Sequence, residues 1–333
     1  MLNKFNIPYK YRKAFIKYGT IKKLVNLFKI EFQKHIGTSK ICGYPYTLTV
    51  DITNVCNLKC IYCPTGQDKS GRMKGFITFA EFKNIIDELK DYLYITNLFN
   101  WGEPLLNKEV FRMVEYVHKN NIFSCLSSNL NHFNEEIGES LLNSGLDYLI
   151  VSIDGINKVS YEKYRKGGDF EKVIKNLEYL LNRRRKLKNN LFIVWRYFIF
   201  PHNEHEVNKA EYMAKELGVD KIEFERGKIG IDCYATRNLN VINSNKLKRC
   251  GWLWHNAVIN WDGGVSPCCL TFYKKDDFGN VFKTGFKNIW NNTKFISSRD
   301  IFNRHNEKNA DPNMRTVCHR CVEEGLYRYA WIE

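Results

Sequence analysis

The sequence contains no uninterrupted apolar run as long as a membrane span, although 44% of its 333 residues are hydrophobic. It also lacks a secretory signal, and its 11 cysteines are unevenly spaced. A framework of disulfide bonds is therefore not expected, because such frameworks belong to secreted proteins. These absences favour a globular, cytoplasmic protein whose cysteines bind metal.

Acidic residues are nearly absent from residues 1–44, where Glu31 is the only acid beside ten Lys or Arg. Five apolar residues of this basic arm recur at helical spacing: Ile21, Leu24, Val25, Phe28 and Phe32. Lys22, Lys23 and Lys29 fall largely off that face. A basic amphipathic helix is typical of membrane-surface binding, so peripheral membrane contact is one expectation. The other is that the apolar face packs on the protein. Nucleic-acid binding is not expected, because no base-reading motif accompanies the charge.

From Thr47 onward, short apolar runs alternate with amphipathic helical stretches. We expect strands at Thr47–Thr53, Ile95–Trp101, Phe123–Asn129, Tyr148–Asp154, Phe192–Phe200 and Lys221–Glu225. We expect helices at Phe79–Asp91, Lys108–Asn120, Glu135–Ser144, Phe170–Lys186 and Glu204–Leu217. Thr78 and Glu81 have the spacing of a capping box. The alternation predicts an α/β fold with right-handed crossovers and a parallel sheet. Six units are too few for a closed eight-stranded barrel, so an open, partial (β/α)6 TIM barrel is expected.

Cys56, Cys60 and Cys63 stand as C-x3-C-x2-C directly after the first expected strand. Three thiolates on one loop can hold three irons of a cubane [4Fe–4S] cluster and leave the fourth iron open to a small molecule. A zinc site is the alternative. Zinc ligands, however, usually come in pairs and close the tetrahedron.

Polar motifs end the next three strands of the series. The second strand ends in Gly102-Glu103-Pro104, the third in Ser127-Ser128-Asn129, and the fourth in Ser152-Ile153-Asp154-Gly155. Each motif alone would also fit an ordinary turn or strand end. In barrels of this kind, chemistry collects at the carboxyl ends of the strands, so we expect the motifs to share one site with the cysteine loop.

The cysteine triad with Tyr62 before its last member, followed by these motifs in this order, resembles the radical S-adenosylmethionine (SAM) superfamily. The resemblance implies a cluster on Cys56, Cys60 and Cys63 whose open iron chelates SAM. The reduced cluster then cleaves SAM to a 5′-deoxyadenosyl radical, which abstracts hydrogen from substrate. It also implies SAM contacts from Tyr62, Gly102, Glu103, Pro104, Ser127, Asn129 and Ser152. An external one-electron donor such as flavodoxin or ferredoxin is the implied partner.

The segment behind the fourth strand reads Tyr161-x3-Arg165-x2-Gly168 and resembles the SPASM/twitch branch of that superfamily. Arg165 is a candidate to pair with a carboxylate of SAM or substrate. The alternative is a solvated side chain in a lysine-rich loop. Glu206, farther along, is expected to be a helix N-terminal acid and not a ligand.

The β/α alternation stops in the last hundred residues, and cysteines return as Cys250, Cys268, Cys318 and Cys321. Apolar runs on either side of Asp262-Gly263 predict a β-hairpin. Four thiolates would enclose a second [4Fe–4S] cluster, with a structural zinc as the alternative. Cys269 blurs the choice of ligand, and the hairpin register favours Cys268. The arrangement resembles a twitch domain, a shortened SPASM domain with one auxiliary cluster.

The expected organisation is a basic arm at 1–44, a barrel at 45–235 and an α+β twitch domain at 236–333. Cys233 falls on the linker that should cross the barrel mouth. Radical SAM epimerases use a thiol there to return hydrogen, so Cys233 is a candidate catalytic donor. A structural or incidental thiol is the alternative, as for Cys42 and Cys125.

The whole arrangement resembles single-auxiliary-cluster enzymes of the 2-deoxy-scyllo-inosamine dehydrogenase type. That resemblance implies oxidation or epimerisation of a sugar or cyclitol. The alternative is a maturase that epimerises or cross-links a ribosomally made peptide. Such maturases often carry a leader-binding domain, which the content of residues 1–44 does not suggest. A non-catalytic electron carrier is disfavoured, because its SAM-contact motifs would have no purpose.

Overall fold

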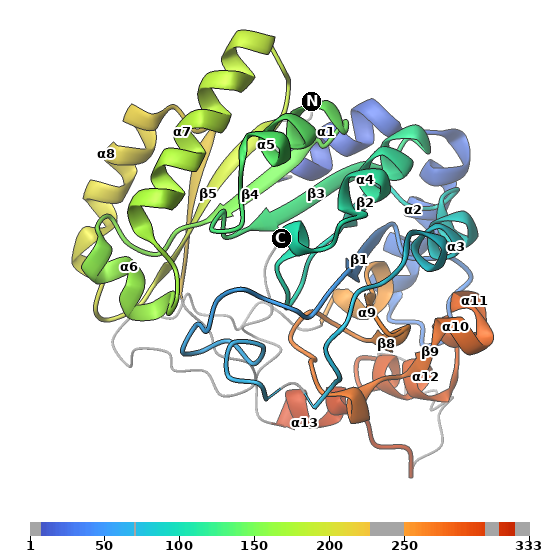
Figure 1. Cartoon of the computed structure of the whole chain (residues 1–333). Coiled ribbons are helices and arrows are strands. Elements are labelled where there is room, and N and C mark those ends of the chain that lie inside the picture. Colours follow the sequence, from blue (N-terminus) through green and yellow to red (C-terminus); the bar gives the residue numbers. More distant parts are fainter. Residues whose placement is uncertain (1–7, 70, 227–249, 304–312, 324–333) are drawn as a thin grey trace.

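A nine-stranded sheet forms the centre of the protein, in the order β6-β5-β4-β3-β2-β1-β7-β8-β9 (Figure 1). The computed structural model describes residues 8–69, 71–226, 250–303 and 313–323. The six parallel strands are β1 Thr47–Asp51, β2 Ile95–Asn97, β3 Phe123–Ser128, β4 Tyr148–Ser152, β5 Phe192–Ile199 and β6 Lys221–Arg226. The six predicted strands therefore all form, and the open, partial barrel is confirmed. β4 is buried along its whole length, as expected of a parallel strand covered on both faces.

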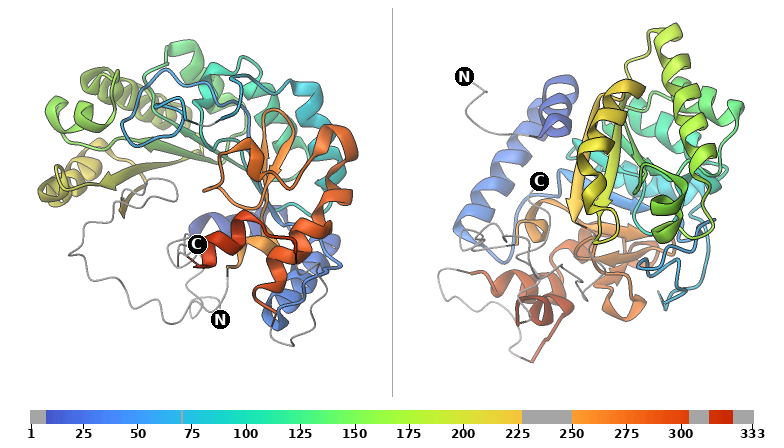
Figure 2. Two further views of the ribbon diagram at one scale, coloured as in Figure 1. Left: turned by 90° about the horizontal axis from the view of Figure 1, so that it is seen from below. Right: turned by 90° about the vertical axis from the view of Figure 1, so that its left-hand side faces the viewer.

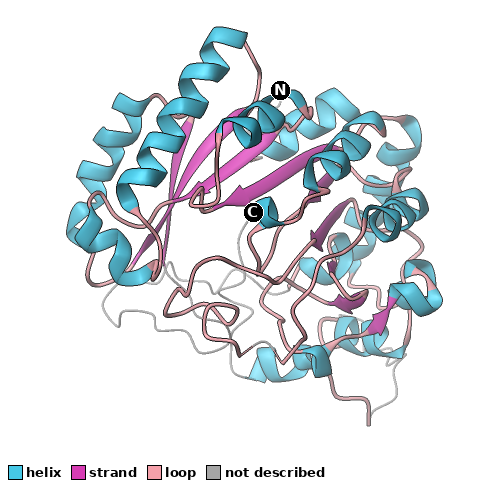
Figure 3. Ribbon diagram, in the orientation of Figure 1, coloured by secondary structure: helices cyan, strands magenta, loops and turns pink. Residues whose placement is uncertain are grey.

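Crossover helices cover one side of this sheet (Figures 2 and 3). They are α3 Phe79–Leu89, α4 Val110–Lys119, α5 Glu135–Asn143, α6 Lys158–Tyr164, α7 Phe170–Leu187 and α8 Val207–Leu217. The predicted capping box is present at α3, where Thr78 and Glu81 each accept the other's backbone N–H. The 3₁₀ turns are η2 Pro104–Leu106, η3 Glu204–Glu206 and η4 Lys274–Asp276. Helix α6 was not predicted; Asn157 caps it by accepting the Ser160 N–H at 3.0 Å.

The basic arm forms two helices, α1 Tyr9–Tyr18 and α2 Ile21–Ile36, on the opposite side of the sheet from the crossover helices (Figure 2). The Tyr9 ring stacks on Phe192 at the start of β5, with ring centroids 3.9 Å apart. The Tyr18 hydroxyl donates to Asp147, just before β4, at 2.9 Å. The arm is thus packed against the amino ends of the strands. No described helix is long and apolar enough to cross a bilayer.

The C-terminal segment continues the same sheet. β7 Val258–Asn260 pairs in parallel with β1, and β8 Gly264–Ser266 returns antiparallel, so the predicted hairpin is confirmed. β9 Gly279–Asn280 forms the edge. The helices of this segment are α9 Trp252–His255, α10 Val281–Thr284, α11 Phe286–Trp290, α12 Thr293–Asp300 and α13 Val317–Glu323.

Arg72 fastens the chain after the cysteine loop to this hairpin region. Its side chain is 2% exposed and donates to both carboxylate oxygens of Asp277, at 2.7 and 2.9 Å. Its other terminal nitrogen pairs with Asp262. Removing one partner of a buried pair leaves the remaining charges uncompensated, which makes this contact a strong constraint on the fold.

We expect Arg72→Ala to lower the free energy of unfolding by about 3–5 kcal/mol, because two largely buried carboxylates lose the buried guanidinium between them. Urea unfolding of protein in one fixed cluster state measures this. Lys74→Ala is the matched control, since its pair with Asp68 is largely exposed and should contribute about 0.5 kcal/mol or less. Equal losses in the two variants would contradict the assignment.

Candidate functional site

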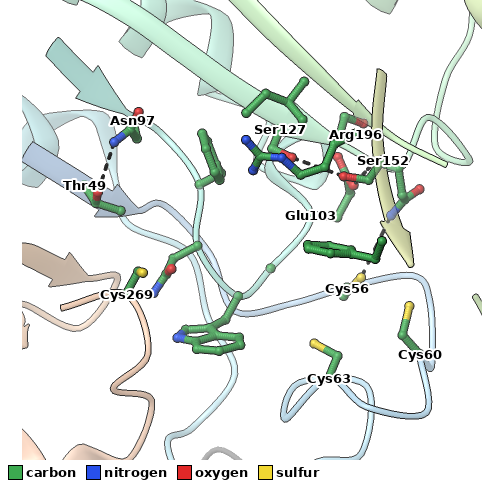
Figure 4. A pocket seen from close by; sticks show the side chains of 18 of the residues that line it. Thr49, Cys56, Cys60, Cys63, Asn97, Glu103, Ser127, Ser152, Arg196 and Cys269 are labelled. Carbon is green, nitrogen blue, oxygen red and sulfur yellow. Dashed lines mark hydrogen bonds between the residues drawn. The ribbon is translucent and has the colours of Figure 1, made fainter. Parts of the chain in front are cut away.

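A cavity lies at the carboxyl ends of the parallel strands, and Figure 4 shows its side chains. It brings together nearly all of the predicted site residues of the barrel. They are Cys56, Cys60, Tyr62, Cys63, Gly102, Glu103, Ser127, Asn129, Ser152 and Arg165. Pro104 does not line it; this residue is buried at the start of the turn η2. Cys233 lies outside the described residues.

The three thiols of the cysteine loop point into one space (Figure 4). The loop is anchored by backbone bonds to the segment after α6: Lys59 N–H donates to the Lys166 carbonyl at 2.8 Å. Burial raises the pKa of Cys56 to about 12 and that of Cys60 to about 11, with Arg165 opposing the shift at Cys60. Buried neutral thiols become thiolates when a cation replaces the proton, so this donor set fits iron binding.

The Gly102-Glu103 turn packs closely against the chain that enters the cysteine loop and is hydrogen-bonded to it. A Cβ on Gly102 would lie 1.9 Å from the Thr53 carbonyl oxygen, so only glycine fits there. The Glu103 N–H donates to the Val55 carbonyl at 2.8 Å. The carboxylate of Asp51 accepts the Trp101 N–H at 3.1 Å. The glycine thus permits a close approach between two loops of the protein itself.

Glu103 ties the turn to the end of β3. Its buried carboxylate accepts the Asn129 N–H at 2.8 Å and the Leu105 N–H at 3.2 Å. Burial raises its pKa to about 7, against the effect of these hydrogen bonds. Asn129 in turn directs its amide nitrogen to the Cys56 sulfur, 4.0 Å away, and to Asn57 at 3.0 Å. Glu103 therefore positions the residue that flanks the first thiol.

Arg165 is not a solvated side chain, so that alternative is wrong. Its side chain is 11% exposed, and its Nε pairs with the fully buried Asp154 at 2.5 Å. Asp154 also accepts the Phe198 N–H at 2.6 Å. The guanidinium is thus held between the S-x-D-G motif and Cys60. Glu206 instead accepts from Asn157 at 3.1 Å and from the Tyr197 hydroxyl at 3.1 Å, and it does not line the cavity.

Sequence analysis did not assign several of the lining residues to this site: Lys10, Thr49, Asn97, Arg196, Trp252 and Cys269. Arg196 had a readable signal, because it is a charged residue inside the apolar run of β5. Its Nη2 lies 3.4 Å from Glu223, and its Nε lies 3.3 Å from Glu225. Cys269 was considered only as a ligand of the second cluster, because its place on the cavity wall depends on how the C-terminal segment folds back.

Two buried donors on the lining, Asn100 Nδ2 and Trp101 Nε1, have no hydrogen-bond partner in the part of the chain that is described. Buried N–H groups are nearly always paired, so these two call for an acceptor from a bound molecule. A carboxylate or hydroxyl-bearing ligand would supply one.

A second group of thiols lies in the C-terminal segment. Cys318 interacts electrostatically with Cys268, Cys250 and Cys321, and burial raises the pKa of Cys250 to about 12. Cys269 lines the cavity instead. Among the described residues, no three His, Cys, Asp or Glu side chains are close enough to share one metal ion. Four thiolates are the donor set of either a closed [4Fe–4S] cluster or a structural zinc.

Residues 50–210 match the family model of the radical SAM superfamily, and residues 250–322 match the SPASM model, an iron-sulfur cluster-binding domain. The AdoMet-dependent heme synthase of Methanosarcina barkeri is 30% identical over 52% of this chain and 48% of its own length. The chain thus spans about half of that relative. The antilisterial bacteriocin subtilosin biosynthesis protein AlbA of Bacillus subtilis is 24% identical over 92% of this chain and 74% of its own length.

Solved structures with the same fold include BtrN in complex with AdoMet and 2-DOIA, with a TM-score of 0.51 and 20% identity. That match covers 79% of this chain and 89% of BtrN. Streptococcus suis SuiB bound to precursor peptide SuiA has a TM-score of 0.55 and 12% identity, over 92% of this chain and 74% of SuiB. At these identities the likeness shows the fold alone.

The pH dependence of stability should report the buried carboxyl of Asp51. Burial raises its folded-state pKa to about 7, so the unfolded chain releases this proton first. Stability is therefore full below the unfolded pKa and is lost as pH rises through the folded one. Asp51 alone contributes a slope of at most about 1.4 kcal/mol per pH unit, and the Glu103 carboxyl, whose pKa is also raised to about 7, adds to it in the same direction.

Urea unfolding of cluster-free protein between pH 5 and pH 7 measures this slope. We expect Asp51→Asn to be less pH-dependent than the wild type, whereas Asp68→Asn, at a largely exposed site, should keep the wild-type slope. Parallel pH curves for all three proteins would show that Asp51 titrates normally.

Proposed function

Because the chain belongs to the radical SAM superfamily and carries a SPASM domain, we propose that it is an enzyme that removes hydrogen from a sugar-like or cyclitol-like small molecule. Cys56, Cys60 and Cys63 would hold the catalytic [4Fe–4S] cluster, and Cys250, Cys268, Cys318 and Cys321 a single auxiliary cluster. When bound, the catalytic cluster and SAM supply a 5′-deoxyadenosyl radical. The observation that carries the proposal is the convergence of three thiols and three strand-end motifs on one cavity.

The residues around the thiols have separable tasks on this proposal. Arg165 places a positive charge beside Cys60, which favours the thiolate form that binds iron. The unpartnered donors of Asn100 and Trp101 suit the carboxylate of SAM. The hydroxyls of Ser127 and Ser152 lie 3.4 Å apart and are suited to hold a ligand at the strand ends. Glu103 and Asp51 hold the loops in place through backbone hydrogen bonds and have no direct role in the reaction on this proposal.

The inner wall of the cavity favours a hydroxyl-rich substrate. Thr49 accepts from the Asn97 amide at 3.2 Å, and Arg196 adds a cation from β5. Beside apolar lining residues such as Phe99 and Ile150, these polar side chains can exchange hydrogen bonds with several hydroxyl groups at once. BtrN, which shares this fold, was solved with AdoMet and 2-DOIA. A carbinol carbon is therefore the favoured site of hydrogen removal.

A second candidate is the modification of a ribosomally made peptide. The match to AlbA extends over 92% of the chain, and the SuiB structure contains precursor peptide SuiA. Epimerisation of either substrate would need a hydrogen donor. Cys233 stays a prediction, and Cys269 supplies a thiol on the cavity wall.

Deuterium transfer distinguishes the two substrate classes. Anaerobic enzyme, SAM and reductant would be incubated with extract from cells grown in D₂O, divided into small-molecule and peptide fractions. Deuterium in 5′-deoxyadenosine from the small-molecule fraction supports the first candidate. Transfer from the peptide fraction alone would favour the second and overturn the first.

We expect the triple variant of Cys56, Cys60 and Cys63 to Ala to lose 5′-deoxyadenosine formation completely, because no other described site gathers these ligands with the strand-end motifs. Cys42→Ala is the control, since that thiol is exposed and outside both groups. Liquid chromatography of the reaction mixture measures the product. SAM cleavage that survives in the triple variant would refute the assignment.

Anaerobically reconstituted protein should contain about eight Fe per chain, as two cubanes demand. Cys268→Ala should weaken the auxiliary cluster and reduce the iron toward about four, whereas the adjacent Cys269→Ala should keep the full iron content. Iron and zinc analysis of the three proteins measures this. The reverse order of the two variants, or stoichiometric zinc in the wild type, would contradict the ligand set.

A further inference from the structure

The face of α2 that was expected either to bind a membrane or to pack on the protein is exposed. Ile21, Phe28 and Phe32 are 84%, 66% and 65% exposed, and Leu24 and Val25 nearly half. We call these five residues the apolar stripe. Among the described residues, half of the large hydrophobic side chains that are exposed belong to the stripe or to Ile16 in α1. The alternative that this face packs on the barrel is therefore wrong.

Polar contacts on the opposite side of α2 fix this orientation. Lys23 is buried, and its ammonium donates to the Asn121 carbonyl at 2.6 Å. The Asn26 side chain donates to the Tyr44 carbonyl at 2.8 Å and accepts the Tyr44 N–H at 2.9 Å. Burial lowers the pKa of Lys23 to about 8. The helix thus buries a lysine and an asparagine while it exposes two phenylalanines.

Close packing prevents α2 from rolling to hide the stripe. Ile30 is fully buried, and a Cβ on Gly43 would lie 2.8 Å from its side chain. At the flank, the Tyr46 hydroxyl donates to Glu31 at 2.8 Å. Any roll would break these contacts together with those of Lys23 and Asn26. The stripe is therefore a fixed feature of the surface, and exposed apolar patches of this kind mark interaction sites.

Charge identifies the partner. Residues 1–44 carry ten basic side chains against one acid. Lys17, Lys22 and Lys34 pair with acids of the protein, whereas Lys29 is exposed beside the stripe. Two copies of the chain joined through this face would bring two strongly positive arms together, which disfavours a dimer. An anionic lipid surface accepts both features, because its headgroups attract lysines and its acyl boundary takes apolar side chains.

We propose that α2 is an interfacial helix that docks this face of the protein on an anionic membrane surface. The arm also adjoins the cavity: Lys10 of α1 lines it, and α2 contacts α9, which contributes Trp252. This inference is independent of the identity of the substrate.

Vesicle co-sedimentation of the full chain tests the proposal. Vesicles of phosphatidylcholine alone would be compared with vesicles that contain phosphatidylglycerol, at low salt. The double variant Phe28→Ser/Phe32→Ser removes the centre of the stripe. Val159→Ser/Tyr212→Ser is the matched control, because both residues are well exposed elsewhere. Iron content and SAM cleavage verify that each variant is folded.

We expect binding to the anionic vesicles only, a partition coefficient at least about tenfold lower in the stripe variant, and no change in the control. Lys29→Gln should weaken binding by about fivefold. Wild-type protein that stays in the supernatant, or equal binding of the stripe and control variants, would overturn the proposal. So would a dimer in lipid-free sedimentation velocity that only the stripe variant dissociates.

Discussion

The contact between Gly102 and the Thr53 carbonyl is the constraint on which the rest of the site depends. A side chain at Gly102 would collide with that oxygen, so the turn after β2 can approach the chain that enters the cysteine loop this closely only because position 102 is glycine. Two buried carboxyls, Asp51 and Glu103, then bind the backbone on either side of the contact. The cysteine loop, the turn and the end of β3 are consequently linked by direct contacts.

Much of this arrangement could be predicted from the sequence, because it follows from patterns among residues that are close together in the chain. Strand and helix periodicity predicted the barrel, and the capping box at Thr78 has a fixed spacing. The strand-end motifs were predictable as a group, since parallel strands deliver their carboxyl ends to one edge. The structural role of Glu103 was not predictable. Its burial and its hydrogen bond to the Asn129 N–H depend on a turn that only the folded chain defines.

What the sequence could not reveal depends on contacts between distant segments. The periodicity of α2 gave its two faces correctly, but not which face meets the protein. That choice is made by Asn121 and Tyr44, which accept the polar side. Likewise, Cys268 and Cys269 are neighbours in sequence, yet one interacts with Cys318 and the other lines the cavity. The lining of the cavity and the exposure of the stripe thus both depend on contacts between the barrel and segments distant from it in sequence.

The central claim is that the three thiols of the cysteine loop leave one iron open to SAM inside this cavity. Mössbauer spectroscopy of ⁵⁷Fe-labelled protein, with and without SAM, tests it most directly. The account predicts that SAM changes the signal of a single iron of the catalytic cluster and leaves the auxiliary cluster unchanged. Identical spectra in the two states, or a change at the auxiliary cluster, would contradict it.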